Sequence, residues 1–233
     1  MARPIPPDRL RQLIDAATRT FVARGYRLTQ MADVAEALGV AKGTLYGYVE
    51  SKEALFDAAL RYSDGKLALP TQSDLPLTTP AAGATVAYVR ERLAGAASNM
   101  ALARVVGGAL VIRDIQRELE TIFSDLYQLL SQNRVAVKLV DRCAPDYPEL
   151  AQIWFGEGRW AQHQLLVEWL GKRSAKGRLR SVPNPEIVAR TILETIAFWA
   201  MHRHFDPSPQ SVSDADAERA VIDLLSNGLL EAR

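Results

Sequence analysis

The sequence predicts an all-α fold, with an N-terminal helix-turn-helix module and a larger C-terminal helical module. Apolar residues recur at helical spacing along almost the whole chain, and no segment alternates as a half-buried strand would. A proline-rich stretch at residues 70–80 separates the two modules. The 233 residues, 48% of them hydrophobic, are enough for a full apolar core.

The N-terminal module is predicted to contain four helices. They cover residues 8–24, 29–38, 41–48 and 51–69. The first has one apolar face and ends before Gly25, a good C-terminal cap. Gly39 separates the two short helices, because glycine tolerates the positive φ that such a turn requires. Ser51 is a natural N-cap for the fourth helix, and Glu53 in its first turn is favoured by the helix dipole.

Helical patterns resume after the proline-rich stretch. They are predicted over residues 81–97, 99–112, 113–141, 149–175, 185–205 and 214–231. The intervening stretches 144–148, 177–185 and 206–213 contain proline or glycine and are expected to be loops.

Residues 29–56 carry the most informative pattern, that of a helix-turn-helix. Its two short helices are expected to bury one apolar stripe, made of Met31, Val34, Ala35, Leu38, Leu45 and Val49. The outer face of the second helix carries short polar residues and then two tyrosines, namely Lys42, Gly43, Thr44, Tyr46, Gly47 and Tyr48. Such a face lets a helix N-terminus approach base edges in the major groove and offers a lysine and hydroxyls to phosphates.

Five short motifs follow one another in this region: FVARG (21–25), MADVA (31–35), LGV (38–40), KGTLY (42–46) and SKEALF (51–56). Through them, residues 9–60 resemble the tetracycline-repressor (TetR) family of bacterial regulators. Two positions depart from that pattern, since Ala41 stands where Ser is usual and Val49 where Phe is usual. The resemblance implies a DNA-binding domain over residues 1–56 and an effector-binding and dimerisation domain over residues 57–233.

The resemblance also implies which residues meet DNA. These are Thr29, Gln30, Lys42, Gly43, Thr44, Tyr46, Tyr48 and Lys52. Thr29 and Gln30 would meet the DNA backbone, and Lys52 would reach a phosphate. The alternatives are that the two tyrosines only cover the helix-turn-helix core and that the two lysines are merely solvated.

The C-terminal module is less distinctive, although residues 124–207 resemble the AefR-like subgroup. The motifs are RVAVKLVD (134–141), DYPEL (146–150), Arg178–Leu179 before Pro183–Pro185, and WAMHRHF (199–205). The predicted helices over 149–175 and 185–205 carry more apolar residues than one stripe needs, which suggests a dimer interface. Its candidates are Leu165, Leu166, Trp169, Ile192, Ile196 and Trp199, and the effector-pocket candidates are Tyr88, Met100, Phe123, Tyr127, Trp154 and His163. Either set could instead fill the monomer core.

The sequence offers no pattern for an enzyme, a metal or a cofactor. His202 and His204 are two apart, so on a helix they point about 200° apart and do not converge on one metal. The single cysteine, Cys143, cannot form an internal disulfide and is expected to be structural rather than redox-active. Without a signal peptide or a run of about 18 apolar residues, the protein is expected to be cytoplasmic. The net charge of +1 argues against a protein that coats polyanions.

Together, the residues and the resemblance imply a ligand-responsive DNA-binding repressor. It would bind a pseudo-palindromic operator on double-stranded DNA as a homodimer and be released by a small apolar or amphipathic effector. The alternative is a constitutive or partner-gated DNA-binding regulator without such an effector. A helical enzyme that merely shares the motif is a third hypothesis.

Overall fold

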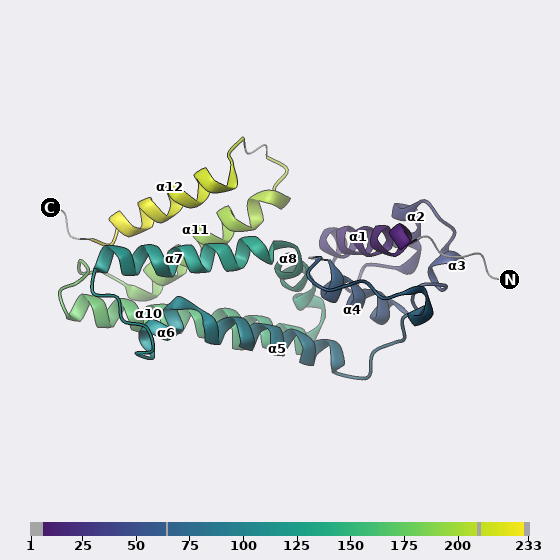
Figure 1. The fold of residues 1–233 in the computed structure, drawn as a ribbon, viewed down its shortest axis with the longest axis horizontal. Helices are drawn as coiled ribbons and strands as arrows, with labels where there is room; N and C mark the ends of the chain where they lie inside the picture. Colours follow the sequence, from purple (N-terminus) through teal and green to yellow (C-terminus); the bar gives the residue numbers. More distant parts are fainter. Residues whose placement is uncertain (1–6, 64, 209–210, 231–233) are drawn as a thin grey trace. The chain divides into compact units, whose positions relative to one another are not determined.

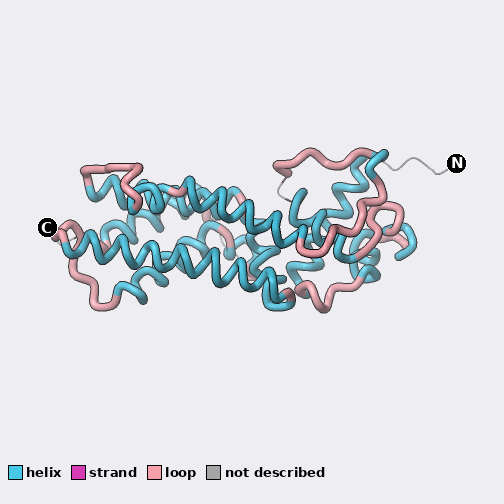
Figure 2. Tube along the Cα trace, turned by 90° about the horizontal axis from the view of Figure 1, so that it is seen from below, coloured by secondary structure: helices cyan, strands magenta, loops and turns pink. Residues whose placement is uncertain are grey.

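The computed structural model describes residues 7–63, 65–208 and 211–230, and these are helices and connecting loops without a β-strand (Figures 1 and 2). The all-α prediction is confirmed. Two compact units divide the chain. The first comprises the chain up to Arg90 together with Val135–Trp154, and the second comprises Glu91–Arg134 and the chain from Phe155 onward. The boundary expected between residues 56 and 57 lies within a helix.

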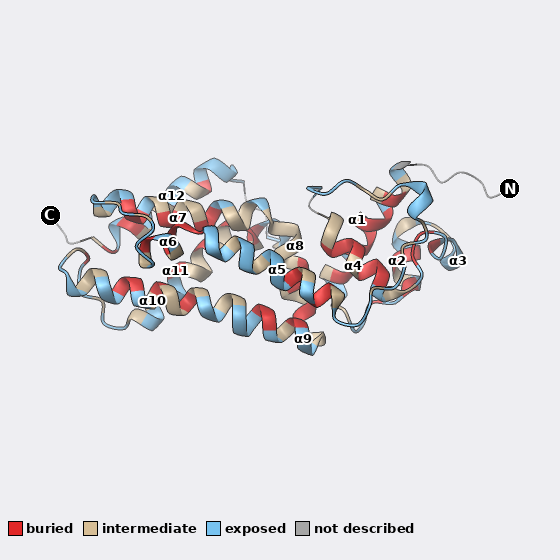
Figure 3. Ribbon diagram, turned by 60° about the horizontal axis from the view of Figure 1, so that its bottom comes forward, coloured by how far each residue is buried: buried red, intermediate tan, exposed pale blue. Residues whose placement is uncertain are grey.

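The first unit begins with the four predicted helices. They are α1 (Pro7–Arg24), α2 (Met31–Leu38), α3 (Lys42–Leu45) and α4 (Lys52–Tyr62). α1 packs against α2 and α4, and its Leu13, Ile14 and Phe21 are fully buried. In Figure 3 the buried residues concentrate on α1 and α4, whereas α3 is largely exposed. Two boundaries were wrong: α3 ends at Leu45 rather than near residue 48, and α4 ends at Tyr62 rather than near residue 69.

The rest of the first unit comes from two further parts of the chain. One is the proline-rich connection, which contains a short 3₁₀ turn, η1 (Gln72–Asp74), and leads into α5 (Ala84–Asn99). The other contains α8 (Arg134–Cys143), the 3₁₀ turn η2 (Ala144–Asp146) and α9 (Pro148–Ala151). α5 and the π-helical segment η3 (Gln152–Arg159) both continue from the first unit into the second.

The second unit is a bundle whose central helix contacts three others. Its elements are α6 (Ala101–Val106), α7 (Ile115–Gln132), α10 (Trp160–Ala175), α11 (Pro185–Ala200), η4 (His202–Phe205) and α12 (Asp214–Asn227). α11 packs against α7, α10 and α12. Three of the long helices predicted here are interrupted: residues 113–141 break at Asn133, residues 149–175 contain the π-helical segment, and residues 185–205 break at Met201. The helix predicted over 99–112 ends at Val106. No helix among the described residues is long and apolar enough to cross a membrane.

A buried carboxylate joins two helices of the second unit. Glu118 on α7 is fully buried, and its Oε1 accepts hydrogen bonds from Trp169 Nε1 at 2.8 Å and Arg173 Nε at 2.6 Å, both on α10. Arg178 NH1 lies 3.7 Å from the other carboxylate oxygen. A buried charge is tolerated only when it is paired in this way, so the two helices are tied together at a defined register.

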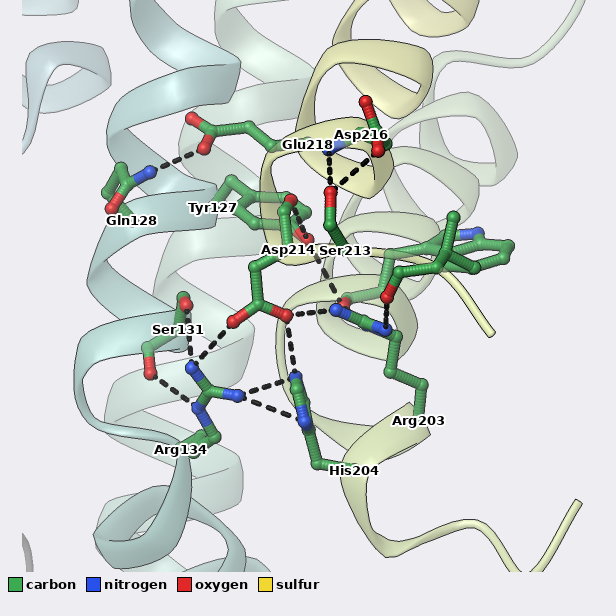
Figure 4. A network of polar contacts seen from close by, with 12 residues as sticks. Tyr127, Gln128, Ser131, Arg134, Arg203, His204, Ser213, Asp214, Asp216 and Glu218 are labelled. Atoms are coloured by element: carbon green, nitrogen blue, oxygen red, sulfur yellow. Dashed lines mark hydrogen bonds and ion pairs between the residues drawn. The ribbon is translucent and has the colours of Figure 1, made fainter. Parts of the chain in front are cut away.

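A second polar network joins the end of α7 and the first residue of α8, Arg134, to η4 and α12 (Figure 4). Asp214 accepts a hydrogen bond from Arg134 NH2 at 3.0 Å and pairs with the buried Arg203. Arg134 NH1 also lies within hydrogen-bond distance of both ring nitrogens of His204, at 3.0 and 2.6 Å. Burial and the charge of Arg134 lower the pKa of His204, outweighing the opposite effect of Asp214. Burial raises the pKa of Asp214, but the hydrogen bond and charge of Arg134 more than offset it, so that pKa is lowered.

Candidate nucleic-acid interface

The helix-turn-helix is formed by α2 and α3 and the turn between them. Gly39 adopts φ 70° and ψ 37°, the left-handed conformation for which glycine is suited. The amide of Val40 donates to the carbonyl of Ala35 at 3.0 Å, which closes the turn. At the start of α2, Asp33 accepts a hydrogen bond from the amide of Gln30 at 2.8 Å, and Leu45 anchors α3 because it is fully buried. The helix-turn-helix predicted over these residues is therefore formed as expected.

α3 and its C-cap carry four of the eight residues expected to meet DNA, and all four are at the surface. Lys42, Gly43, Thr44 and Tyr46 are exposed, and the side chain of Tyr46 retains 45% of its accessible surface. No atom lies within 4 Å of the position that a Cβ would take at Gly43, so this end of the helix is open to the close approach of a partner. Tyr48 differs, because it is 5% exposed and belongs to the core of the module.

Thr29 is turned into the protein, whereas its neighbour Gln30 is exposed. Thr29 is 1% exposed, and its hydroxyl donates to the carbonyl of Gly25 at 2.7 Å. This bond ties the end of α1 to the start of α2. Of the pair expected to meet the DNA backbone, only Gln30 offers its side chain at the surface.

Lys52 is engaged within the first unit. Its ammonium group donates to the carbonyl of Arg27 at 3.3 Å and lies 4.5 Å from the centre of the Tyr26 ring. Burial lowers the pKa of Lys52, against the opposing effect of nearby carboxylates such as Glu53. An amine held in this way is a weaker phosphate ligand than an extended one, since it must give up these contacts first.

A contact missed in the sequence holds the loop between α1 and α2. Asp146 in η2 accepts a hydrogen bond from the amide of Arg27 at 3.1 Å. Gly25, at φ 83°, leaves space for this contact, because a Cβ there would lie 2.5 Å from Asp146 Oδ2. The ring of Tyr26 meets those of Phe56 at 4.9 Å and Tyr147 at 5.3 Å between centroids. Asp146 and Tyr147 lie about 120 residues from this loop in the sequence, and no local pattern identifies them as its partners.

Cys143, the last residue of α8, is enclosed in the core of the first unit. It is fully buried, and its Sγ lies 3.8 Å from the carbonyl of Phe21. Burial raises the pKa of the thiol to about 12, even though the charge of Arg142 opposes the change. Burial and the raised pKa together predict low reactivity of this thiol at neutral pH.

The residues suggested for an effector pocket are divided between the two units. Tyr88 and Trp154 belong to the first unit, and Met100, Phe123, Tyr127 and His163 belong to the second. All except the half-buried Tyr88 are buried. Several have polar partners: Trp154 Nε1 donates to Asp141 at 2.8 Å, Tyr127 donates to the carbonyl of Trp199 at 3.2 Å, and His163 Nε2 lies 3.0 Å from the carbonyl of Glu186. These contacts are those of core residues, and a pocket role for the six stays a prediction.

The residues suggested for a dimer interface are mostly in the core of the second unit. Leu166, Trp169, Ile192 and Ile196 are at most 2% exposed, and Leu165 and Trp199 are half-buried. The same two helices carry two other large apolar side chains that are exposed, Trp160 at 58% and Ile187 at 64%. The Trp160 ring stacks on that of His163, which contacts the residue before Ile187. These contacts connect the start of α10 with the start of α11.

Residues 13–59 match the model of the family described as bacterial regulatory proteins, tetR family. Two curated relatives align with the same region. One is an uncharacterised HTH-type transcriptional regulator, YhgD of Bacillus subtilis, 44% identical over 50 residues, which are 22% of this chain and 26% of the relative. The other is the HTH-type transcriptional repressor KstR2 of Rhodococcus jostii, 42% identical over 50 residues, 22% of this chain and 24% of the relative. The alignment thus spans about a quarter of the length of these relatives.

Solved structures resemble the chain over nearly its whole length. The ketosteroid transcriptional regulator KstR2 of Mycobacterium tuberculosis gives a TM-score of 0.58 at 17% identity and covers 98% of both chains. The probable transcriptional regulatory protein RHA5900 gives 0.59 at 20% identity, with 96% of this chain and 100% of the other covered. At these identities the likeness concerns the fold alone. The AefR-like resemblance of residues 124–207 stays a prediction.

Proposed function

We propose, from the TetR-type helix-turn-helix domain at residues 13–59, that this chain is a ligand-responsive transcriptional regulator that reads DNA with α2 and α3. The observation that carries the proposal is the exposed polar face of α3. Lys42, Thr44 and Tyr46 are exposed, while Leu45 anchors α3 in the core. Major-groove reading requires this arrangement of an exposed polar face on an anchored helix. Relatives that share this domain are named as transcriptional regulators, and KstR2 as a repressor.

The regulator acts as a homodimer on a pseudo-palindromic operator. A single chain has one helix-turn-helix, which we call the reading head. Two reading heads must lie about 34–36 Å apart to contact two half-sites on one face of DNA. The exposed Trp160 and Ile187 offer an apolar face on α10 and α11 that a second copy would cover. The buried candidates on these helices would then support the interface from beneath rather than form it.

A small apolar or amphipathic effector releases the operator in this proposal, and the regulator is a repressor. Met100, Phe123 and Tyr127 give the core of the second unit the apolar and aromatic character that such a ligand requires. To shift the dimer from 99:1 in favour of the DNA-competent state to 1:99, the effector must prefer the other state by about 5.5 kcal/mol.

Selection from random DNA duplexes of about 30–40 base pairs tests the proposal. The purified chain is expected to enrich a pseudo-palindrome, and Lys42→Ala with Tyr46→Ala is expected to abolish the enrichment. Lys172→Ala, at an exposed position on α10, is the matched control and should retain it. Failure of the folded wild-type protein to enrich any sequence would refute the proposal. An enriched operator that no compound in a broad panel releases would favour the regulator without an effector.

A further inference from the structure

The connection between α4 and α5 returns to the end of α3, the proposed recognition helix (Figure 1). We call residues 71–79 the strap. The amide of Leu77 donates to the carbonyl of Tyr48 at 2.8 Å, and the amide of Glu50 donates to the carbonyl of Leu77 at 3.0 Å. These two bonds form a short parallel bridge between Val49 and Leu77. The strap is thus paired with the backbone that leaves α3.

Two side-chain contacts extend this pairing to the start of α4. Glu50 accepts a hydrogen bond from the amide of Thr79 at 2.9 Å, and the Thr79 hydroxyl donates to that of Ser51 at 2.8 Å. Ser51 is the N-cap of α4, since its Oγ also accepts from the amide of Ala54 at 3.1 Å. The strap therefore fixes the whole connection from α3 to α4.

The strap also has internal order of its own. Asp74 accepts from the amide and from the hydroxyl of Thr71, both at 2.7 Å. These bonds lower the pKa of the Asp74 carboxyl, with the hydroxyl contributing most. The segment that pairs with the end of α3 is thus held in a turn rather than left as a free loop.

α3 is short and has little stability of its own. α3 has only four residues, and Ala41 supplies no side-chain cap. One helical turn is marginal by itself, because nucleation fixes several residues for a single hydrogen bond. Leu45, Tyr48 and Val49 anchor this end of the helix in the core through their side chains. The strap adds backbone pairing at Tyr48 and Glu50 and a side-chain contact at Ser51.

We infer that the strap is a positioning element for DNA reading, with Glu50 and Thr79 as its positioning residues. The inference rests on the proposed DNA-binding function. Base-edge hydrogen bonds are directional, whereas phosphate contacts tolerate small displacements of the helix. Loosening the strap therefore lowers discrimination between sequences and leaves non-specific binding almost unchanged. Neither side chain has to touch DNA for this effect.

A pair of double variants tests the inference on the full-length protein. Glu50→Ala with Thr79→Ala removes the carboxylate acceptor and the hydroxyl. Glu50→Gln with Thr79→Ser is the matched control, since it keeps an acceptor and a hydroxyl at the same net charge as the alanine pair. The ratio of operator affinity to affinity for a scrambled duplex should fall about tenfold in the alanine pair relative to the control. Affinity for the scrambled duplex should agree within about twofold.

The outcomes distinguish a failure of the inference about the strap from a failure of the proposed function. Wild-type protein that enriches no duplex defeats the proposed function and the inference with it. An enriched operator with an unchanged ratio, or with equal loss on both duplexes, overturns the inference alone. Hydrogen exchange supplies a readout without DNA: the amides of Leu77 and Glu50 should be protected in the wild type and the control and exchange faster in the alanine pair. Unprotected amides in the wild type would also overturn it.

Discussion

Replacing Tyr46 or Tyr48 by alanine should have different effects: loss of Tyr46 should weaken operator binding, and loss of Tyr48 should lower the stability of the fold. Tyr46 is 45% exposed, so Tyr46→Ala should change the free energy of unfolding by about 0.5 kcal/mol. Tyr48 is 5% exposed, and removing a buried aromatic ring should cost about 3–5 kcal/mol. For operator affinity the order is reversed: among the folded proteins, Tyr46→Ala should weaken binding more than Tyr48→Ala. A base or phosphate contact by Tyr46 is worth about 1–3 kcal/mol at each half-site.

Urea unfolding and operator titration on the same samples measure both quantities. Tyr46→Ala is expected to keep the wild-type unfolding midpoint while operator binding weakens by at least about tenfold. Tyr48→Ala is expected to lower the midpoint, with any loss of binding explained by the unfolded fraction. The reasoning is refuted if Tyr46→Ala destabilises the protein as much as Tyr48→Ala, or if it leaves operator affinity unchanged.

Three further predictions concern single side chains. Lys42→Gln should reduce the slope of log affinity against log salt by about two per dimer. Lys52→Gln should leave the slope unchanged, because the Lys52 amine is held by the carbonyl of Arg27. Equal slopes for the two variants would contradict this prediction. Cys143, with a pKa raised to about 12 by burial, should resist iodoacetamide at pH 8 in the native protein and react once it is unfolded; rapid native labelling would show that the thiol is accessible. The lowered pKa of His204 means that the folded state favours the neutral imidazole. The contribution of His204 to stability is therefore complete above the unfolded-state pKa of about 6.5 and is lost as the pH falls from there through the lower folded-state pKa. The melting temperature should therefore drop between pH 7.5 and 5.5, and His204→Gln should reduce that drop.

The helix-turn-helix was predictable because its signals are local. Gly39 marks a left-handed turn, and Leu45 marks the one side chain that anchors α3, and neither depends on distant residues. Tyr46 and Tyr48 could not be distinguished in this way. α3 ends at Leu45, and the turn that follows it, not a helical period, leaves Tyr46 exposed and buries Tyr48.

Contacts between distant parts of the chain were not predictable in this way. The strap meets the end of α3 across 28 or 29 positions, and Asp146 meets Arg27 across 119. Polar residues such as Thr79 and Asp146 are common in loops, and nothing in their spacing names a partner. The ends of α3 and α4 were misplaced for a related reason, since tertiary contacts and not helix propensity determine where the chain turns back.

The charges around α2 and α3 give a reason why the position of α3 would be important for the proposed reading of DNA. Arg24 pairs with Asp33 at 2.7 Å, Arg27 lies 3.9 Å from Asp146, and Lys52 donates to a backbone carbonyl. Arg24 and Lys52 would have to leave these partners before meeting a phosphate, so each would add less to DNA affinity than a solvated lysine. The long pair of Arg27, whose side chain is 79% exposed, restrains that residue much less. Under the proposed function, more of the binding free energy would then depend on directional contacts made by one turn of helix. Its specificity would depend on the backbone that holds this turn, and that backbone is paired with the strap.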